Sequence, residues 1–356
     1  MIYKYRDRDF TGIDGHMFVH NGITEENTPF YIHNLSNQVN TLNITKSDGS
    51  TPTLVVEKST DSFRWERMEV VNDSITTTVP VGGILYLRCN TPDWKQHRIS
   101  MVGDFEVCGN IMSLLYGENY TGGETIFPTG STTGFTSLFR GCIHLIHSSK
   151  LILPATTLIG SCYSYMFGGC ENLLDTPALP ATTLAGSCYK AMFTGCESII
   201  EAPALPATTL KESCYWVMFQ DCNSLIKAPS LPATTLANYC YDHMFSGCTS
   251  LVNAPDLPGS TLKYNCYLGM FSGCTSLTKA PDLLAETLVG SCYARMFDGC
   301  TSLNSIKCMA SDLSASNCLY EWVNGVNASG TFTKLYGKSW PSGTSGIPTG
   351  WTVQNA

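Results

Sequence analysis

The chain has 356 residues, of which 43% are hydrophobic and 14% are charged, and its formal net charge is −8. This composition predicts a folded protein rather than a disordered one, and the length allows two domains. The acidic excess is mild and there is no basic stripe to follow phosphates, so we expect no nucleic-acid partner. No apolar run approaches the ~20 residues of a membrane span, so we expect no membrane insertion.

Residues 1–28 have mixed charge and weak periodicity, which predicts an N-terminal arm. Asp7, Asp9 and Asp14 lie close together in this arm, but they lack the calcium-loop pattern, and a solvated acidic stretch is the better interpretation. The start of the chain is charged and has no apolar h-region, so we expect no secretory signal in it. A protein that leaves a cell by lysis and a protein whose signal has been removed both fit this observation.

Residues 29–121 contain short β-branched or aromatic runs separated by turn residues such as Gly82-Gly83. This pattern predicts a small all-β, sandwich-like domain, which we interpret as an attachment domain. Trp65 and Trp94 are interpreted as packing residues of this domain. Residues 122–137, rich in Gly, Thr and Ser, predict a junction.

The rest of the chain is organised by a repeat of 26 residues. A first cysteine returns at this step at Cys162, Cys188, Cys214, Cys240, Cys266, Cys292 and Cys318. A second returns at Cys170, Cys196, Cys222, Cys248, Cys274 and Cys300. Such a period predicts a solenoid, because one unit cannot bury its apolar face alone. We place the solenoid at residues 138–305, with an atypical first coil, and a C-terminal cap at residues 306–356.

The segment LPATTLAGSCYKAMFTGC, residues 179–196, serves as the reference copy of the repeat. Leu184, Cys188 and Met192 are four residues apart, which predicts one face of a short helix. Thr182 or Thr183 would cap this helix with its hydroxyl group.

A strand-like segment is expected to follow, with Ile199, Ala202 and Leu205 pointing inward, and its prolines keep it short. One strand and one helix per coil define an α/β solenoid of the leucine-rich-repeat type.

Fifteen of the 17 cysteines lie from Cys142 onward, nearly all in the two repeat registers. A ladder of small buried side chains is the preferred interpretation, because free cysteine is among the most buried residue types. A set of disulfides is the alternative. Zinc is disfavoured because the repeats contain almost no histidine and their cysteines are spaced C-x7-C. Cys142, His144 and His147 look like metal ligands, but no fourth partner is in view.

The repeat motif CYxxMFxGCxSLxxAP–LPATTL resembles the BspA-like leucine-rich-repeat proteins, which occur on bacterial surfaces and in some phage structural proteins. The segments FEVCGNIMSLLYG and GIPTGWTVQNA also resemble sequences that flank such repeats. The resemblance covers about residues 100–356. It implies adhesion or partner binding, and it brings no catalytic residue and no cofactor.

Positions that vary between repeats are the candidate contact residues, because the consensus positions build the core. One group is expected on the outer face of the helices: Trp216, Tyr239, Asp242, Tyr264 and Leu268. An exposed aromatic cluster indicates a contact site; the alternative is that the helix phase differs and these rings pack on adjacent coils. A second group is expected on the strand side: Glu201, Lys227, Asn253 and Lys279. Mixed charge there also fits an ordinary solvated surface.

The sequence lacks a phosphate-binding loop, an H-E-x-x-H motif and a G-x-S-x-G elbow, so we expect no enzyme. We predict a non-enzymatic phage virion component, such as a fibre or decoration protein. Residues 1–121 would bind other virion proteins, and the repeats would bind a host-surface protein or glycan. We also expect a homo-oligomer. The alternative is a bacterial cell-surface adhesin. A carbohydrate-active enzyme is the remote alternative, since a glycosidase needs only two carboxylates.

Overall fold

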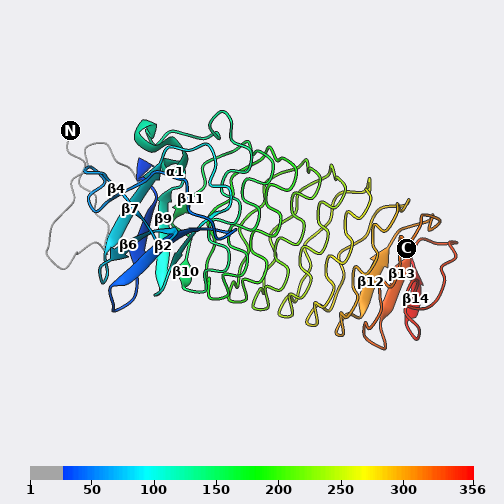
Figure 1. Cartoon of the computed structure of the whole chain (residues 1–356). Helices are drawn as coiled ribbons and strands as arrows, with labels where there is room; N and C mark the ends of the chain where they lie inside the picture. Colours follow the sequence, from blue (N-terminus) through cyan, green and yellow to red (C-terminus); the bar gives the residue numbers. More distant parts are fainter. Residues whose placement is uncertain (1–26) are drawn as a thin grey trace, which may run out of the picture.

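The structure, a computed structural model, describes residues 27–356; the predicted arm and its acidic stretch lie outside these residues except for Asn27 and Thr28. Nine strands open the described chain: β1 (Tyr31–Asn34), β2 (Asn40–Lys46), β3 (Val56–Ser59), β4 (Glu66–Arg67), β5 (Val70–Val71), β6 (Ser74–Val79), β7 (Ile84–Cys89), β8 (His97–Met101) and β9 (Phe105–Asn110). They form two sheets, one with the order β9-β1-β7-β3-β4 and one with the order β5-β6-β2-β8. The expected β-rich N-terminal part is therefore present (Figure 1).

Alternating burial explains why these runs become strands of a layered structure. In β7, every second residue is buried, and in β2 Leu42 and Ile44 point into the same core. Trp94 is fully buried and donates its indole N–H to the carbonyl of Leu114, 2.8 Å away, in the short helix α1 (Ser113–Tyr116). Trp65 is half-buried beneath the Arg88 guanidinium. Both tryptophans are thus packing residues, as the sequence predicted.

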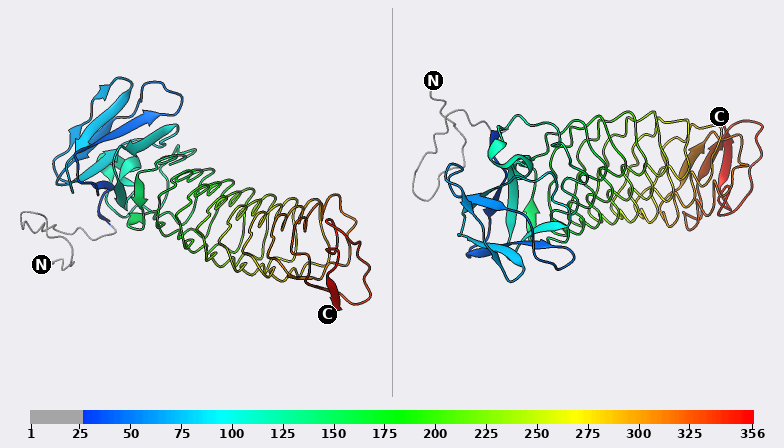
Figure 2. Two further views of the ribbon diagram at one scale, coloured as in Figure 1. Left: turned by 90° about the horizontal axis from the view of Figure 1, so that it is seen from below. Right: turned by 45° about the horizontal axis from the view of Figure 1, so that its top comes forward.

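Strand β9 connects the sheets to the repeats. All six of its residues are buried, and it pairs antiparallel with β1 on one side. On the other side it pairs parallel with β10 (Leu145–His147) and β11 (Leu151–Ile152), which belong to the first coil. The sheet therefore runs on into the coils without a break (Figure 1, Figure 2).

The repeats form a β-rich stack of coils, and the predicted helix in each coil is wrong. The helices among the described residues are α1 and the 3-10 turn η2 (Gly117–Asn119), both before the repeats. In the reference coil, Tyr189 donates its N–H to the Cys214 carbonyl of the next coil at 3.1 Å. The N–H of Met192 goes back three residues to the carbonyl of Tyr189 at 3.2 Å. Local turns thus alternate with bonds between coils.

The turns repeat every four residues. Ser187, Ala191 and Gly195 have φ values of 56°, 53° and 68°, in the left-handed region, and the same positions recur in the other coils. The physical reason is the spacing of the coils: equivalent phenylalanine rings in successive coils have centroids 5.4 to 5.8 Å apart. Packed α-helices need about 8–10 Å between their axes, so a helix in every coil cannot stack at this distance.

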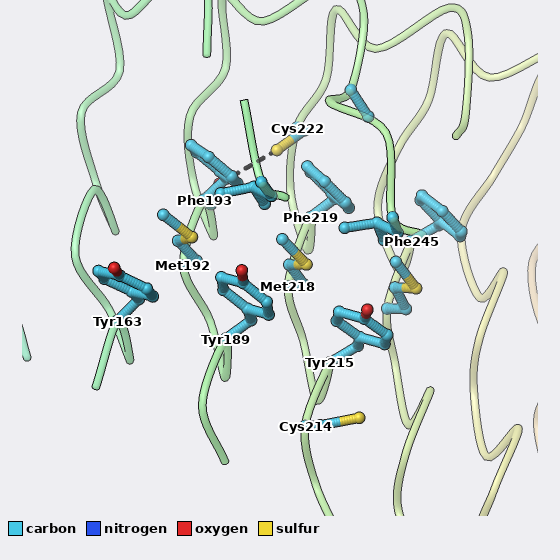
Figure 3. Packing of buried hydrophobic residues seen from close by; sticks show 14 of the residues in the cluster. Tyr163, Tyr189, Met192, Phe193, Cys214, Tyr215, Met218, Phe219, Cys222 and Phe245 are labelled. Atoms are coloured by element: carbon cyan, nitrogen blue, oxygen red, sulfur yellow. Dashed lines mark hydrogen bonds between the residues drawn. The ribbon is translucent and has the colours of Figure 1, made fainter. Parts of the chain in front are cut away.

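Buried side chains form continuous ladders along the stack (Figure 3). A tyrosine ladder runs from Tyr163 to Tyr293 with ring centroids 5.7 to 6.0 Å apart. The second-register cysteines donate their thiol hydrogen to a phenylalanine carbonyl of the preceding coil, as Cys222 does to Phe193 at 3.1 Å. All 17 cysteines are buried and free. The interpretation of the cysteines as core residues is therefore confirmed.

The strand-like side of each coil contacts its neighbours through single parallel bridges rather than long strands, as its prolines predict. Ile199 is fully buried, and Leu205 and Ala202 are nearly so, which confirms their inward orientation. The stack ends in a parallel sheet of β12 (Ser305–Cys308), β13 (Thr331–Lys334) and β14 (Thr352–Asn355). Aromatic side chains close the core at this end: Trp322, Phe332, Trp340 and Trp351.

Candidate functional site

The predicted aromatic residues come together on the turn side of the coils. The ring centroids of Trp216 and Tyr239 are 6.5 Å apart, and those of Tyr239 and Tyr264 are 5.6 Å apart in an edge-on arrangement. Tyr264 is 48% exposed, whereas Trp216 and Tyr239 are half-buried. The rings thus contact neighbouring coils, as the alternative interpretation held, and still present part of their surface to solvent.

Cations extend this row toward the sheets. The Lys190 ammonium lies 3.9 Å from the Trp216 ring centroid and 5.9 Å from that of Tyr165, one coil to the other side. The Arg140 guanidinium lies 4.5 Å from the Tyr165 centroid. Contacts of this kind hold rings in place and contribute about 0.5–1 kcal/mol at exposed sites. We call this row the aromatic stripe; its members are Arg140, Tyr165, Lys190, Trp216, Tyr239 and Tyr264.

Two of the predicted contact residues border the stripe in different ways. Asp242 is only 4% exposed, so its predicted place on the outer surface is wrong. Its carboxylate accepts a hydrogen bond from the Nδ1 atom of His243, and burial raises its pKa. Leu268 is half-buried, and its carbonyl accepts the His243 backbone N–H at 2.7 Å. Asp242 is thus a buried residue between two larger side chains, Trp216 and Leu268, which occupy the same position in the preceding and the following coil.

The predicted strand-side group forms a column of equivalent positions. Parallel bridges join Glu201 to Lys227, Lys227 to Asn253, and Asn253 to Lys279. All four side chains are exposed, and Lys227 forms an ion pair with Glu201. We call this the polar column. Asp175 precedes Glu201 in it, but its carboxylate is engaged by His147 and by the backbone N–H groups of Ser148 and Ser149.

Sequence reasoning missed a second column directly beside the polar one. Its members precede the polar residues by one position and are exposed by between 42% and 56%: Leu174, Ile200, Ile226 and Val252. We call this the aliphatic column. The signal was present in the sequence, because the position four residues after the second cysteine is aliphatic in four successive coils. In both the stripe and this column, large side chains of successive coils stand in a row and present surface to solvent.

The three residues of the first coil that look like metal ligands have separate partners. His144 pairs with Asp104 at 3.1 Å, and His147 pairs with Asp175 at 2.6 Å. Cys142 donates its thiol hydrogen to the carbonyl of Ile99, and burial raises the pKa of this thiol to about 12. Over residues 27–356, no group of three or more His, Cys, Asp or Glu side chains is arranged to hold a metal ion.

Within the same range, no helix has the length and apolarity required to cross a membrane. The thiols have raised pKa values because of burial throughout the two ladders, as for Cys188 and Cys300, both at about 12. A thiol that stays protonated is a poor nucleophile, so the ladders offer packing rather than covalent chemistry.

No protein-family model, curated protein or solved structure matches this chain.

Proposed function

We propose that this protein is a non-enzymatic recognition and structural protein whose stacked coils present the aromatic stripe to a partner. The observation that carries the proposal is the run of contacts from Arg140 through Lys190 and Trp216 to Tyr264. These residues occupy positions that vary between repeats, so the packing of the core does not require a particular side chain there. Partly exposed aromatic and cationic side chains are the residue types that dominate binding energy in protein interfaces.

We also propose that the stack is a leucine-rich-repeat solenoid of the BspA-like kind, in which a run of turns replaces each helix. The CYxxMFxGC motif supports this, because its tyrosine, methionine, phenylalanine and cysteine positions are the buried ladders. The resemblance to BspA-like proteins implies adhesion. The aromatic rings of the stripe could stack on the face of a sugar, and its cations could pair with an acidic group. A host-surface protein or glycan is the proposed partner.

The proposed setting is a phage particle, with this chain as a fibre or decoration protein. The supporting observations are the resemblance to repeats found in phage structural proteins and the β-sheet part at the N-terminal end of the coils (Figure 2). That part is proposed to attach the chain to other virion proteins. Quantitative mass spectrometry of purified virions tests this setting: the chain should be present in a fixed ratio to the capsid protein. Virions that never contain it would refute the proposal.

A bacterial surface adhesin is the alternative that the same resemblance favours. Protease shaving of intact bacteria distinguishes the two settings. Peptides of the repeats released from uninfected cells would favour the adhesin, whereas peptides found in virions alone would favour the fibre protein.

A further inference from the structure

The aliphatic column is the starting point, because it leaves apolar surface in water. Leu174, Ile200, Ile226 and Val252 are 49%, 56%, 53% and 42% exposed and stand at equivalent positions of successive coils. The backbone holds them in line: the N–H of Ile226 donates to the carbonyl of Ile200 at 3.0 Å. Four such side chains in a row, about 5 Å apart, form a contiguous apolar strip, and such strips mark interaction surfaces.

The polar column beside this strip has an ordered charge pattern. Read along the stack, it begins with the acidic Asp175 and Glu201 and continues with Lys227, the neutral Asn253 and Lys279. The acidic end therefore faces the sheets and the basic end faces the C-terminus. A surface with this polarity is complementary to itself when a second copy lies against it in the opposite direction.

We propose that two copies of this chain associate antiparallel through the aliphatic and polar columns. A twofold axis between the coils of Ile200 and Ile226 places each of these residues opposite the other in the partner copy. The same axis brings Leu174 opposite Val252, and Glu201 opposite Lys227. An isologous interface requires this self-complementarity, in which residue i contacts j and j contacts i.

The alternative side-by-side arrangement, with both chains running in the same direction, is disfavoured by charge. When the two aliphatic columns face each other in this arrangement, the two polar columns lie on opposite edges of the contact, so Glu201 and Lys227 meet no opposite charge in the partner copy. In the antiparallel arrangement each of these two residues meets its opposite charge. The charge pattern thus selects the orientation, and the aliphatic column supplies the apolar surface that is buried.

The size of the contact sets the expected strength. Four aliphatic side chains and a flanking row of polar ones form a narrow contact, at or below the low end of about 1,200 Å² for stable interfaces. We therefore expect a dimer that dissociates on dilution rather than an obligate one. The aromatic stripe takes no part in this contact, so the dimer does not depend on the proposed recognition function.

Sedimentation velocity of the full chain over a range of concentrations tests the proposal. The wild type should shift from monomer to dimer as its concentration rises, and Ile200→Lys/Ile226→Lys should stay monomeric at every concentration. The matched control, Thr208→Lys/Thr234→Lys, adds the same charges at exposed positions of the LPATTL segment and should dimerise like the wild type. Thermal unfolding of each variant shows whether the monomer is still folded.

Charge reversal tests the orientation. Glu201→Lys and Lys227→Glu should each weaken the dimer at least threefold, and the double variant should restore it. Loss of the ion pair within the chain affects the monomer little, because exposed pairs contribute about 0–1 kcal/mol. A wild type that is monomeric throughout, or a dimer that survives the Ile200/Ile226 change, would overturn the proposal. Single reversals that leave the dimer unchanged would overturn the antiparallel arrangement.

Discussion

The ammonium group of Lys190 lies 3.9 Å from the ring centroid of Trp216 in the next coil, and this pair is the tightest cation–ring contact of the aromatic stripe. The two residues are 26 positions apart, so the repeat itself brings them together. A double-mutant cycle with Lys190→Met and Trp216→Leu should give a coupling energy of about 0.5–1 kcal/mol in urea unfolding. Lys211→Met, an exposed change in the same coil as Trp216, should show no coupling to Trp216. Coupling of equal size for both lysines would contradict the contact.

A backbone of repeated turns and a helix predict opposite effects of a glycine-to-alanine change on stability. Gly269 has φ +56°, and a Cβ atom there would come within 2.4 Å of the Nε2 atom of His243. Gly269→Ala should therefore destabilise the chain by about 1–2 kcal/mol, whereas in a helix it would stabilise by about 1 kcal/mol. Gly186→Ala is the control, because its Cβ would meet nothing closer than 3.7 Å and its φ is ordinary. Chemical denaturation of the two variants measures the difference in their free energies of unfolding. A Gly269→Ala variant that is more stable than the wild type would contradict the turn conformation at this position.

The buried thiols should be inert in the native protein. Burial raises the pKa of Cys188, Cys240 and Cys300 to about 12, so they remain protonated at neutral pH. Only the thiolate reacts with a disulfide reagent. Titration with such a reagent at pH 8 should detect almost no thiol in the folded chain and all 17 after denaturation. Reductant should leave the melting temperature unchanged. Rapid labelling of the thiols in the folded chain, or a melting temperature that drops with reductant, would contradict the interpretation of the cysteines as free, buried core residues.

The joint between the sheets and the first coil should weaken in acid. The pKa of Glu106 lies below its usual value because the His33 side chain, 2.8 Å away, hydrogen-bonds its carboxylate, with Lys150 adding to the effect. As pH falls, Glu106 is therefore protonated at a higher pH in the unfolded chain than in the folded one. The contribution of Glu106 to stability is complete above the unfolded pKa of about 4.3 and is lost as pH falls through the lower folded value.

Glu106→Gln tests this linkage. Urea unfolding between pH 3 and 7 should show a lower free energy of unfolding for the variant at neutral pH and convergence with the wild type in acid. Glu66→Gln is the comparison, because Glu66 also pairs with a lysine, Lys58, but its side chain is 72% exposed. Curves for Glu106→Gln that run parallel to the wild type at all pH values would contradict the linkage.

Much of the frame could be predicted from the sequence. The step of 26 residues identified the coils, and the invariant cysteines and the inward Ile199 identified their core. The helix could not be excluded in the same way. Leu184, Cys188 and Met192 lie four residues apart, and this spacing suits a helix face as well as a turn that repeats every four residues. Only the distance between successive coils distinguishes a helix from repeated turns, and this distance is a property of the whole stack rather than of one repeat.

The candidate surface was predicted in part, for a related reason. Trp216, Tyr239 and Tyr264 occupy different positions of the repeat, but all three lie within two residues of the first cysteine, and this segment stacks on itself from coil to coil. The burial of Asp242 depends on the larger side chains on either side of it, which a single repeat does not show. The aliphatic column escaped notice because one exposed isoleucine is ordinary, and its meaning appears only when four coils are aligned.

Residues that depart from the repeat pattern, on the turn side of the coils, are proposed to contact the partner. Saturation binding of the labelled full chain to intact host cells tests this most directly, with Trp216→Ala/Tyr264→Ala compared with the control Thr208→Ala/Thr234→Ala. We expect saturable binding by the wild type and by the control, and binding at least tenfold weaker by the stripe variant, with an unchanged melting temperature. Equal binding by the wild type and the folded stripe variant would contradict this proposal.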